Sequence, residues 1–169
     1  MKTSVALIAA AAALSLGVSA EAATKKKAAA PAVPPPAIKY IPSPNPASPI
    51  GAGAIVPAGS ELFFVSGIPG DAKAGDTAAQ TTDALTKLSK VLTDNGYTLS
   101  DVVNAKVYLV ADPTTNKMDF AGMNKSFATF FGTATEPNKP SRVTVQIAAL
   151  AGPGSLVEIE LVAAKAPKK

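Results

Sequence analysis

Residues 76–110 read DTAAQTTDALTKLSKVLTDNGYTLSDVVNAKVYLV and join a helix pattern directly to a strand pattern. Asp76 and Thr77 can cap a helix whose apolar residues recur near helical spacing, and Gly96 can end it. These apolar residues are Ala78, Leu85, Leu88 and Leu92, with Val91 beside them. The β-branched stretch 102–110 then predicts a long strand with Val103, Ala105, Val107 and Leu109 on one face, ended by Asp112-Pro113.

Further helix and strand patterns lie on both sides of this unit. Residues 62–66 form an apolar run typical of a buried strand, and we expect residues 54–57 to be its hairpin partner. Aromatic residues and a methionine at helical spacing predict a second helix that ends at Gly132 and buries this stripe in the core. The stripe consists of Phe120, Met123, Phe127, Phe130 and Phe131. With strands at 142–148 and 156–163, the order ββαβαββ predicts an α+β fold, a single sheet with both helices on one face.

The N-terminus has the pattern of a secretory signal peptide over residues 1–22. A short positive start is followed by an uncharged apolar run over residues 5–16, and small residues at 18–20 and 20–22 offer two cleavage sites. The run is shorter than the ~20 residues that a stable membrane anchor needs. We therefore predict a periplasmic or secreted protein without a stable membrane anchor.

The next segment, residues 23–48, is rich in Pro, Ala and Lys. Because proline fixes φ and removes a backbone donor, we expect an extended, largely polyproline-like spacer there. The composition changes at Pro49, and residues 49–163 are long enough for one compact domain. Residues 164–169 form a basic tail.

The composition excludes several kinds of chemistry. The chain has no Cys and no His, so disulfides, the usual zinc sites and Ser-His or Cys-His nucleophile pairs are excluded. Acidic residues are scattered singly except in Glu158-Ile159-Glu160, and we predict no metal and no cofactor. The net charge is +4, yet residues 49–163 hold eight basic and eleven acidic residues, so we predict no nucleic-acid partner.

The last two predicted strands carry the candidate site. Strand alternation places Arg142, Thr144 and Gln146 on one face of the first, and Glu158 and Glu160 on one face of the second. If the strands are antiparallel neighbours, a guanidinium and a carboxylate can share one end of the sheet. Arg142 is the only arginine, and its fork suits bidentate binding of a carboxylate. From spacing alone, a surface ion pair explains the residues equally well.

Short motifs spread in order over about residues 48–163 resemble those of one protein family, the RidA (YjgF-type) family. No single motif is diagnostic, but their order and register are shared. They are Ser66-Gly67-Ile68-Pro69, Gln80-Thr81 with Ala84-Leu85, Asp101 to Leu109, Asp119 to Asn124, Phe130-Phe131-Gly132, Pro140 to Val145 and Leu156 to Glu160.

The resemblance implies a chorismate-mutase-like fold and a homotrimer with clefts between subunits. In those clefts the Rid proteins hydrolyse enamines and imines, including 2-imino acids, to 2-oxo acids and ammonia without a cofactor. Arg142 matches the arginine that grips the substrate carboxylate, and Glu158 matches the glutamate that directs water. Gly67 lies in the loop whose backbone holds substrate, whereas Asn124 matches a residue of subunit contact or cleft structure.

Two departures from the family pattern fall in the wall of the cleft. Residues 50–54 read IGAGA where the family has a tyrosine after Gly-Pro, and residues 66–69 are one residue shorter than the usual motif. Two hypotheses therefore stand side by side: an imine deaminase, or a non-catalytic trimer of the same fold that binds small carboxylates or acts as a chaperone.

Overall fold

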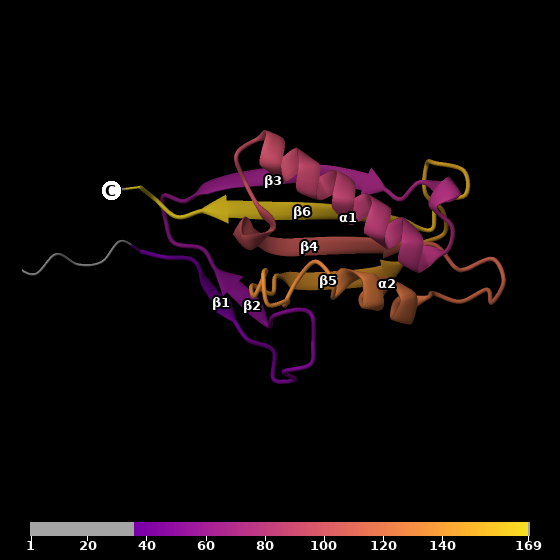
Figure 1. The fold of residues 1–169 in the computed structure, drawn as a ribbon, viewed down its shortest axis with the longest axis horizontal. Coiled ribbons are helices and arrows are strands. Elements are labelled where there is room, and N and C mark those ends of the chain that lie inside the picture. The colour runs from indigo at the N-terminus through magenta and orange to yellow at the C-terminus, as the bar shows by residue number, and fades with distance from the viewer. Residues whose placement is uncertain (1–35, 169) are drawn as a thin grey trace, which may run out of the picture. The chain divides into compact units, whose positions relative to one another are not determined.

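The computed structural model describes residues 36–168 (Figure 1). The predicted signal peptide and the first half of the predicted spacer lie outside these residues. The elements in chain order are β1 (Lys39–Ile41), β2 (Gly53–Ile55), β3 (Glu61–Pro69), η1 (Ala72–Ala74), α1 (Thr77–Asp94), η2 (Leu99–Asp101), β4 (Val102–Leu109), α2 (Phe120–Phe127), β5 (Ser141–Gln146) and β6 (Val157–Lys165). None of the helices in this part of the chain is long and apolar enough to cross a membrane.

The main sheet has four strands in the order β3-β6-β4-β5. β6 is antiparallel to both β3 and β4, whereas β4 and β5 are parallel. The parallel pair follows from the connection, because α2 carries the chain back across the sheet between β4 and β5. β5 is consequently an edge strand, and β4 separates it from β6.

Both helices cover the same face of this sheet, which confirms the predicted α+β arrangement (Figure 1). Asp76 caps α1 as predicted by accepting a hydrogen bond of 2.8 Å from the amide of Ala79, and the helix ends just before Gly96, whose φ is 76°. Three leucines of α1 are fully buried against the strands, at positions 85, 88 and 92. The opposing strand residues include Ala105, Val107, Leu109, Ile159 and Leu161.

The aromatic stripe of the second helix was predicted to be core throughout, and this is wrong at its first residue. Met123, Phe127 and Phe131 are buried, but Phe120 is 44% exposed. α2 also ends at Phe127, where the amides of Phe130 and Phe131 both bond to the carbonyl of that residue in a turn. Phe120, at the first position of α2, lies beside the guanidinium of Arg142 instead of in the core.

The predicted hairpin partner of β3 is also wrong. β2 pairs with β1 in a separate two-stranded sheet, in which Tyr40 lies opposite Ala54. β1 lies in the segment predicted to be an extended, largely polyproline-like spacer. Its three residues pair because the intervening residues turn the chain back, with the amide of Ala52 bonded to the carbonyl of Ile41 at 2.8 Å.

The last strand is longer than predicted and uses the first residues of the predicted tail. Ala164 and Lys165 belong to β6 and pair with Leu62 and Glu61 of β3. The ammonium of Lys165 lies 4.7 Å from the centre of the Tyr97 ring, so this lysine packs on the domain.

Candidate functional site

Arg142 lies on the face of β5 that the helices cover. It pairs with the fully buried Ala105 of β4 and therefore points to the same side of the sheet. Its Nη2 donates a hydrogen bond of 2.8 Å to Oδ1 of Asn124 on α2. The guanidinium carbon lies 4.4 Å from the ring centre of Phe127 and 5.7 Å from that of Phe120. An aromatic and amide surface on α2 thus holds the only arginine of the chain.

Most of the hydrogen-bonding capacity of this guanidinium is unused. Nε and Nη1 of Arg142 are buried and have no hydrogen-bond partner among the described residues. Burial lowers the pKa of Arg142 from 12.5 to about 10, which leaves the group charged at neutral pH. A buried cation with free donors can bind an anion, and the planar shape of the guanidinium suits a carboxylate.

Thr144 is a site residue that the predicted Arg/Glu pair did not include. It lies two residues after Arg142 on the same face of β5, opposite Val107, and its hydroxyl oxygen is buried without a partner. Strand alternation indicated the shared face. The sequence could not show, however, that the hydroxyl is buried without a hydrogen-bond partner, because this depends on how α2 and β4 pack around the strand.

Glu158 lies on the other face of the sheet, which no helix covers. It alternates with the fully buried Val157 and Ile159 and pairs with Tyr108 of β4 and Pro69 of β3. The neighbouring Glu160 forms an ion pair with Lys106 on this same open face. The structure thus accounts for Glu160 as an ion-pair residue and leaves Glu158 without a hydrogen-bond partner among residues 36–168.

Gly67 and Glu158 are brought into direct contact. Gly67 is part of strand β3, not of a loop, at a bulge where Val65 pairs with Leu161 and Ile68 with Ile159. A Cβ built on Gly67 would lie only 2.2 Å from Oε1 of Glu158. Only a residue without a side chain allows the carboxylate to lie so close to the backbone here.

Arg142 and Glu158 are not brought together within one chain. β4 lies between their strands, and the two side chains point to opposite faces of the sheet. Their pairing partners Ala105 and Tyr108 are three residues apart, so the backbones are separated by about 10 Å along the strands and about 10 Å across them. The expectation that both groups share one end of the sheet is therefore wrong, because it required β5 and β6 to be neighbours.

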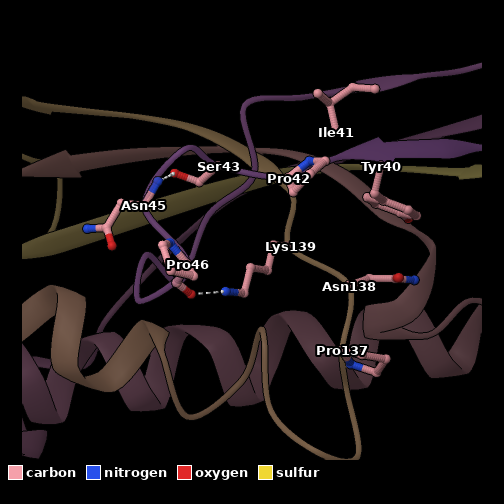
Figure 2. A pocket seen from close by; sticks show the side chains of 9 residues that line it. All are labelled: Tyr40, Ile41, Pro42, Ser43, Asn45, Pro46, Pro137, Asn138 and Lys139. Atoms are coloured by element: carbon pink, nitrogen blue, oxygen red, sulfur yellow. Dashed lines mark hydrogen bonds between the residues drawn. The ribbon is translucent and has the colours of Figure 1, made fainter.

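A separate pocket lies at the N-terminal hairpin (Figure 2). Its volume is about 320 Å³, and its lining comes from residues 40–43, 45–46 and 137–139. The ammonium of Lys139 bonds to the carbonyl of Pro46 at 2.9 Å across it. Neither Arg142 nor Glu158 lines this pocket.

No cluster of acidic residues in residues 36–168 is close enough to hold a metal ion. Asp101 and Glu136 lie near Tyr40, where their charges and the burial of the phenol raise its pKa to about 12, with burial the larger cause. Buried polar atoms without hydrogen-bond partners are instead concentrated on the helix side of β5, at Arg142 and Thr144.

The fold is that of a small α+β protein with a buried, incompletely hydrogen-bonded arginine on an edge strand. Residues 45–165 match the family model described as endoribonuclease L-PSP, and the chain belongs to that family, the RidA/YjgF family. A RutC family protein of Pyrococcus horikoshii is 36% identical over 115 residues, which are 65% of this chain and 83% of that protein. The RutC family protein YoaB of Escherichia coli is 34% identical over 105 residues, or 62% and 83% of the two chains.

Solved structures agree on the fold. YyfB of Yersinia pestis, a Rid family protein of unknown function, matches with a TM-score of 0.59 over 75% of this chain and 97% of its own, at 24% identity. A member of the YjgF protein family from Neisseria meningitidis matches with a TM-score of 0.51 at 27% identity, over 78% and 97% of the chains. The arrangement of helices and sheet is thus that of the family.

Proposed function

We propose that the protein hydrolyses reactive 2-imino and enamino acids to 2-oxo acids and ammonia. One observation carries the proposal: the buried guanidinium of Arg142 is charged and has two nitrogens without a partner. A 2-imino acid supplies the missing carboxylate and places its imine carbon beside it. Membership of the RidA/YjgF family supports the same substrate class.

The chemistry requires water, a positioned substrate and one proton-transferring group. Arg142 binds the carboxylate and fixes the C=N bond. Glu158 accepts a proton from water as the oxygen attacks the imine carbon and gives this proton to the nitrogen. It then transfers the hydroxyl proton of the resulting carbinolamine to the same nitrogen, so that ammonia leaves as the carbonyl forms. An enamine enters this sequence after a proton has moved from nitrogen to carbon. Positioning and one general acid/base contact, worth about 10²–10⁴ in rate, suffice for such a reactive substrate.

The site must join two copies of the chain, because Arg142 and Glu158 lie on opposite faces in one copy. The open face of the sheet supports such an assembly. Phe64 on the edge strand β3 is 71% exposed, and Val143 and Val145 on the opposite edge strand β5 are 48% and 40% exposed, so both edges carry large exposed apolar side chains. We propose a homotrimer in which Arg142 of one subunit and Glu158 of a neighbour form each cleft, located in the periplasm or outside the cell after signal-peptide cleavage.

The assay generates an imino acid with an amino-acid oxidase and lets the protein compete with semicarbazide for it. The wild type should lower the yield of trapped imine, and Arg142→Ala and Glu158→Gln should abolish this effect. Glu160→Gln is the matched control, because Glu160 lies on the same strand face but pairs with Lys106. A wild type that never outcompetes the trap for any of a panel of imines rules out the deaminase.

One feature of the cleft wall favours a second function. In this function, a trimer binds small carboxylates or unfolded clients without catalysis. Gly53 lies in the stretch where the family carries its cleft tyrosine, and a Cβ there would meet no atom within 4 Å. A site lacking that side chain can bind without reacting. Carboxylates that raise the melting temperature, with no imine hydrolysis, support this function; no binding and no suppression of client aggregation exclude it.

A further inference from the structure

Buried polar atoms without partners gather at one place in the described chain. Five such side-chain atoms occur in residues 36–168, and three of them are Nε and Nη1 of Arg142 and Oγ1 of Thr144. Buried polar atoms nearly always have a partner, because leaving them unpaired is costly. Three unpaired atoms on two residues of one strand face therefore indicate a partner that binds there.

The position of Thr144 allows it to share that partner with Arg142. The two residues are separated by one position on the helix-covered face of β5, so their Cα atoms are about 7 Å apart. β5 is the edge strand of the sheet, with β4 as its sole neighbour there. Both side chains therefore lie at an edge of the sheet that no further strand among the described residues extends.

Packing does not explain the hydroxyl of Thr144. Thr144 lies opposite the fully buried Val107, and valine has the same shape as threonine without the polar atom. Valine would fill this space and would leave no hydrogen bond unmade. The hydroxyl is thus better explained as a donor to a group outside the chain.

We propose that Oγ1 of Thr144 donates a hydrogen bond to the same carboxylate that Arg142 binds, and so raises the affinity of the site for that group. A carboxylate accepts about four hydrogen bonds, so one group can serve the guanidinium and the hydroxyl together. The inference deepens the proposed function, on whose carboxylate site it rests. It adds a residue that determines affinity and leaves the hydrolytic step to Glu158.

The test is calorimetric binding of 2-oxobutanoate, with the uncharged 2-oxobutanamide as the reference ligand. Thr144→Val keeps the shape and removes the hydroxyl, and it should weaken 2-oxobutanoate binding about tenfold, as expected for one hydrogen bond to a charged group. Thr144→Ser keeps the hydroxyl and should bind within about twofold of the wild type. Thr86→Val on the exposed side of α1 is the matched control and should not change the affinity.

Binding separates this inference from the proposed activity. If the wild type binds 2-oxobutanoate and Thr144→Val loses affinity, the inference stands even when no imine is hydrolysed. If the enzyme is active, Thr144→Val should raise KM and leave kcat nearly unchanged. Equal affinities of wild type and Thr144→Val, or a wild type that binds the oxo acid no better than the amide, overturn the inference.

Discussion

Nη2 of Arg142 donates a hydrogen bond of 2.8 Å to Oδ1 of Asn124, the one acceptor that this guanidinium has in residues 36–168. The bond joins the edge strand β5 to the middle of α2. Because the amide oxygen is neutral, it orients the guanidinium without cancelling its charge. Asn124 therefore acts on a ligand through Arg142, as a positioning residue.

Replacing Asn124 should weaken carboxylate binding in two graded steps. Asn124→Ala removes the orienting acceptor and should raise the Kd for 2-oxobutanoate about tenfold. Asn124→Asp keeps an acceptor but adds a negative charge, which pairs with the guanidinium and competes with the ligand, so its Kd should rise further. Calorimetry measures both, with the exposed neighbour Lys125→Ala as the control. An Asn124→Asp protein that binds as tightly as the wild type contradicts this role.

A side chain at Gly67 should displace the carboxylate of Glu158. Gly67→Ala places a methyl group where Oε1 of Glu158 lies, 2.2 Å away, and the strand or the carboxylate must move. Because the carboxylate is the end of a flexible side chain and can rotate away, we expect a loss of at most about 1 kcal/mol in the free energy of unfolding, measured by urea denaturation.

A double-mutant cycle tests whether the stability lost in Gly67→Ala comes from the contact between residue 67 and Glu158. Glu158→Ala empties the space, so Gly67→Ala made in that background should lose much less stability than in the wild type. Gly53→Ala is the matched control, because a Cβ there meets nothing within 4 Å. Additive effects of the two substitutions would show that the cause lies elsewhere in β3.

Elements with strong local signals were predictable from the sequence. The Asp76 cap, the spaced leucines and Gly96 define α1 without reference to other segments, and the β-branched run defines β4. The partner of β2 was not predictable, because pairing depends on contacts distant in sequence. The sequence pattern of residues 54–57 suits pairing with either β1 or β3, and the turn between β1 and β2 decides in favour of β1.

The candidate site was predictable as a set of residues but not as an arrangement. Alternation correctly put Arg142 and Thr144 on one face of β5, yet it cannot tell which face the helices cover. It also cannot give the strand order, so the separation of Arg142 from Glu158 by β4 was not foreseeable. Gly67 was linked to the site through the resemblance, whereas its contact with Glu158 comes from the bulge in β3.

Replacing Arg142 by a neutral side chain of similar length should stabilise the protein. A buried cation without an anion lowers stability, and burial lowers the pKa of Arg142 to about 10 for this reason. Arg142→Met should therefore raise the free energy of unfolding by about 1 kcal/mol at neutral pH, while it abolishes carboxylate binding.

The stability gain of Arg142→Met should depend on pH, because burial lowers the pKa of Arg142 in the folded wild type. Below pH 10 the arginine is charged in both the folded and the unfolded wild type, so the advantage of Arg142→Met is constant. Between about 10 and the ordinary 12.5 the folded state loses the proton first, so the wild type gains stability relative to the variant and the difference narrows. Urea denaturation of both proteins from pH 7 to 11 measures it. A variant less stable than the wild type at pH 7 contradicts the argument.

Tyr40 tests whether the segment before the family match is part of the stable domain. It lies in β1, ahead of residues 45–165, and its hydroxyl donates a hydrogen bond of 2.7 Å to the carbonyl of Ser100. Tyr40→Phe should lower the free energy of unfolding by about 1 kcal/mol, because this hydrogen bond is lost.

The pKa of Tyr40 is raised from 10.0 to about 12, so the folded state retains the proton that the unfolded state releases above pH 10. The advantage of the wild type over Tyr40→Phe should accordingly be constant below pH 10 and should fall steadily as the pH rises from 10 towards about 12. Tyr108→Phe is the matched control, since the Tyr108 hydroxyl forms no side-chain hydrogen bond among the described residues. If Tyr40→Phe unfolds at the same urea concentration as the wild type at pH 8, β1 contributes nothing to the domain, and the folded unit begins after it.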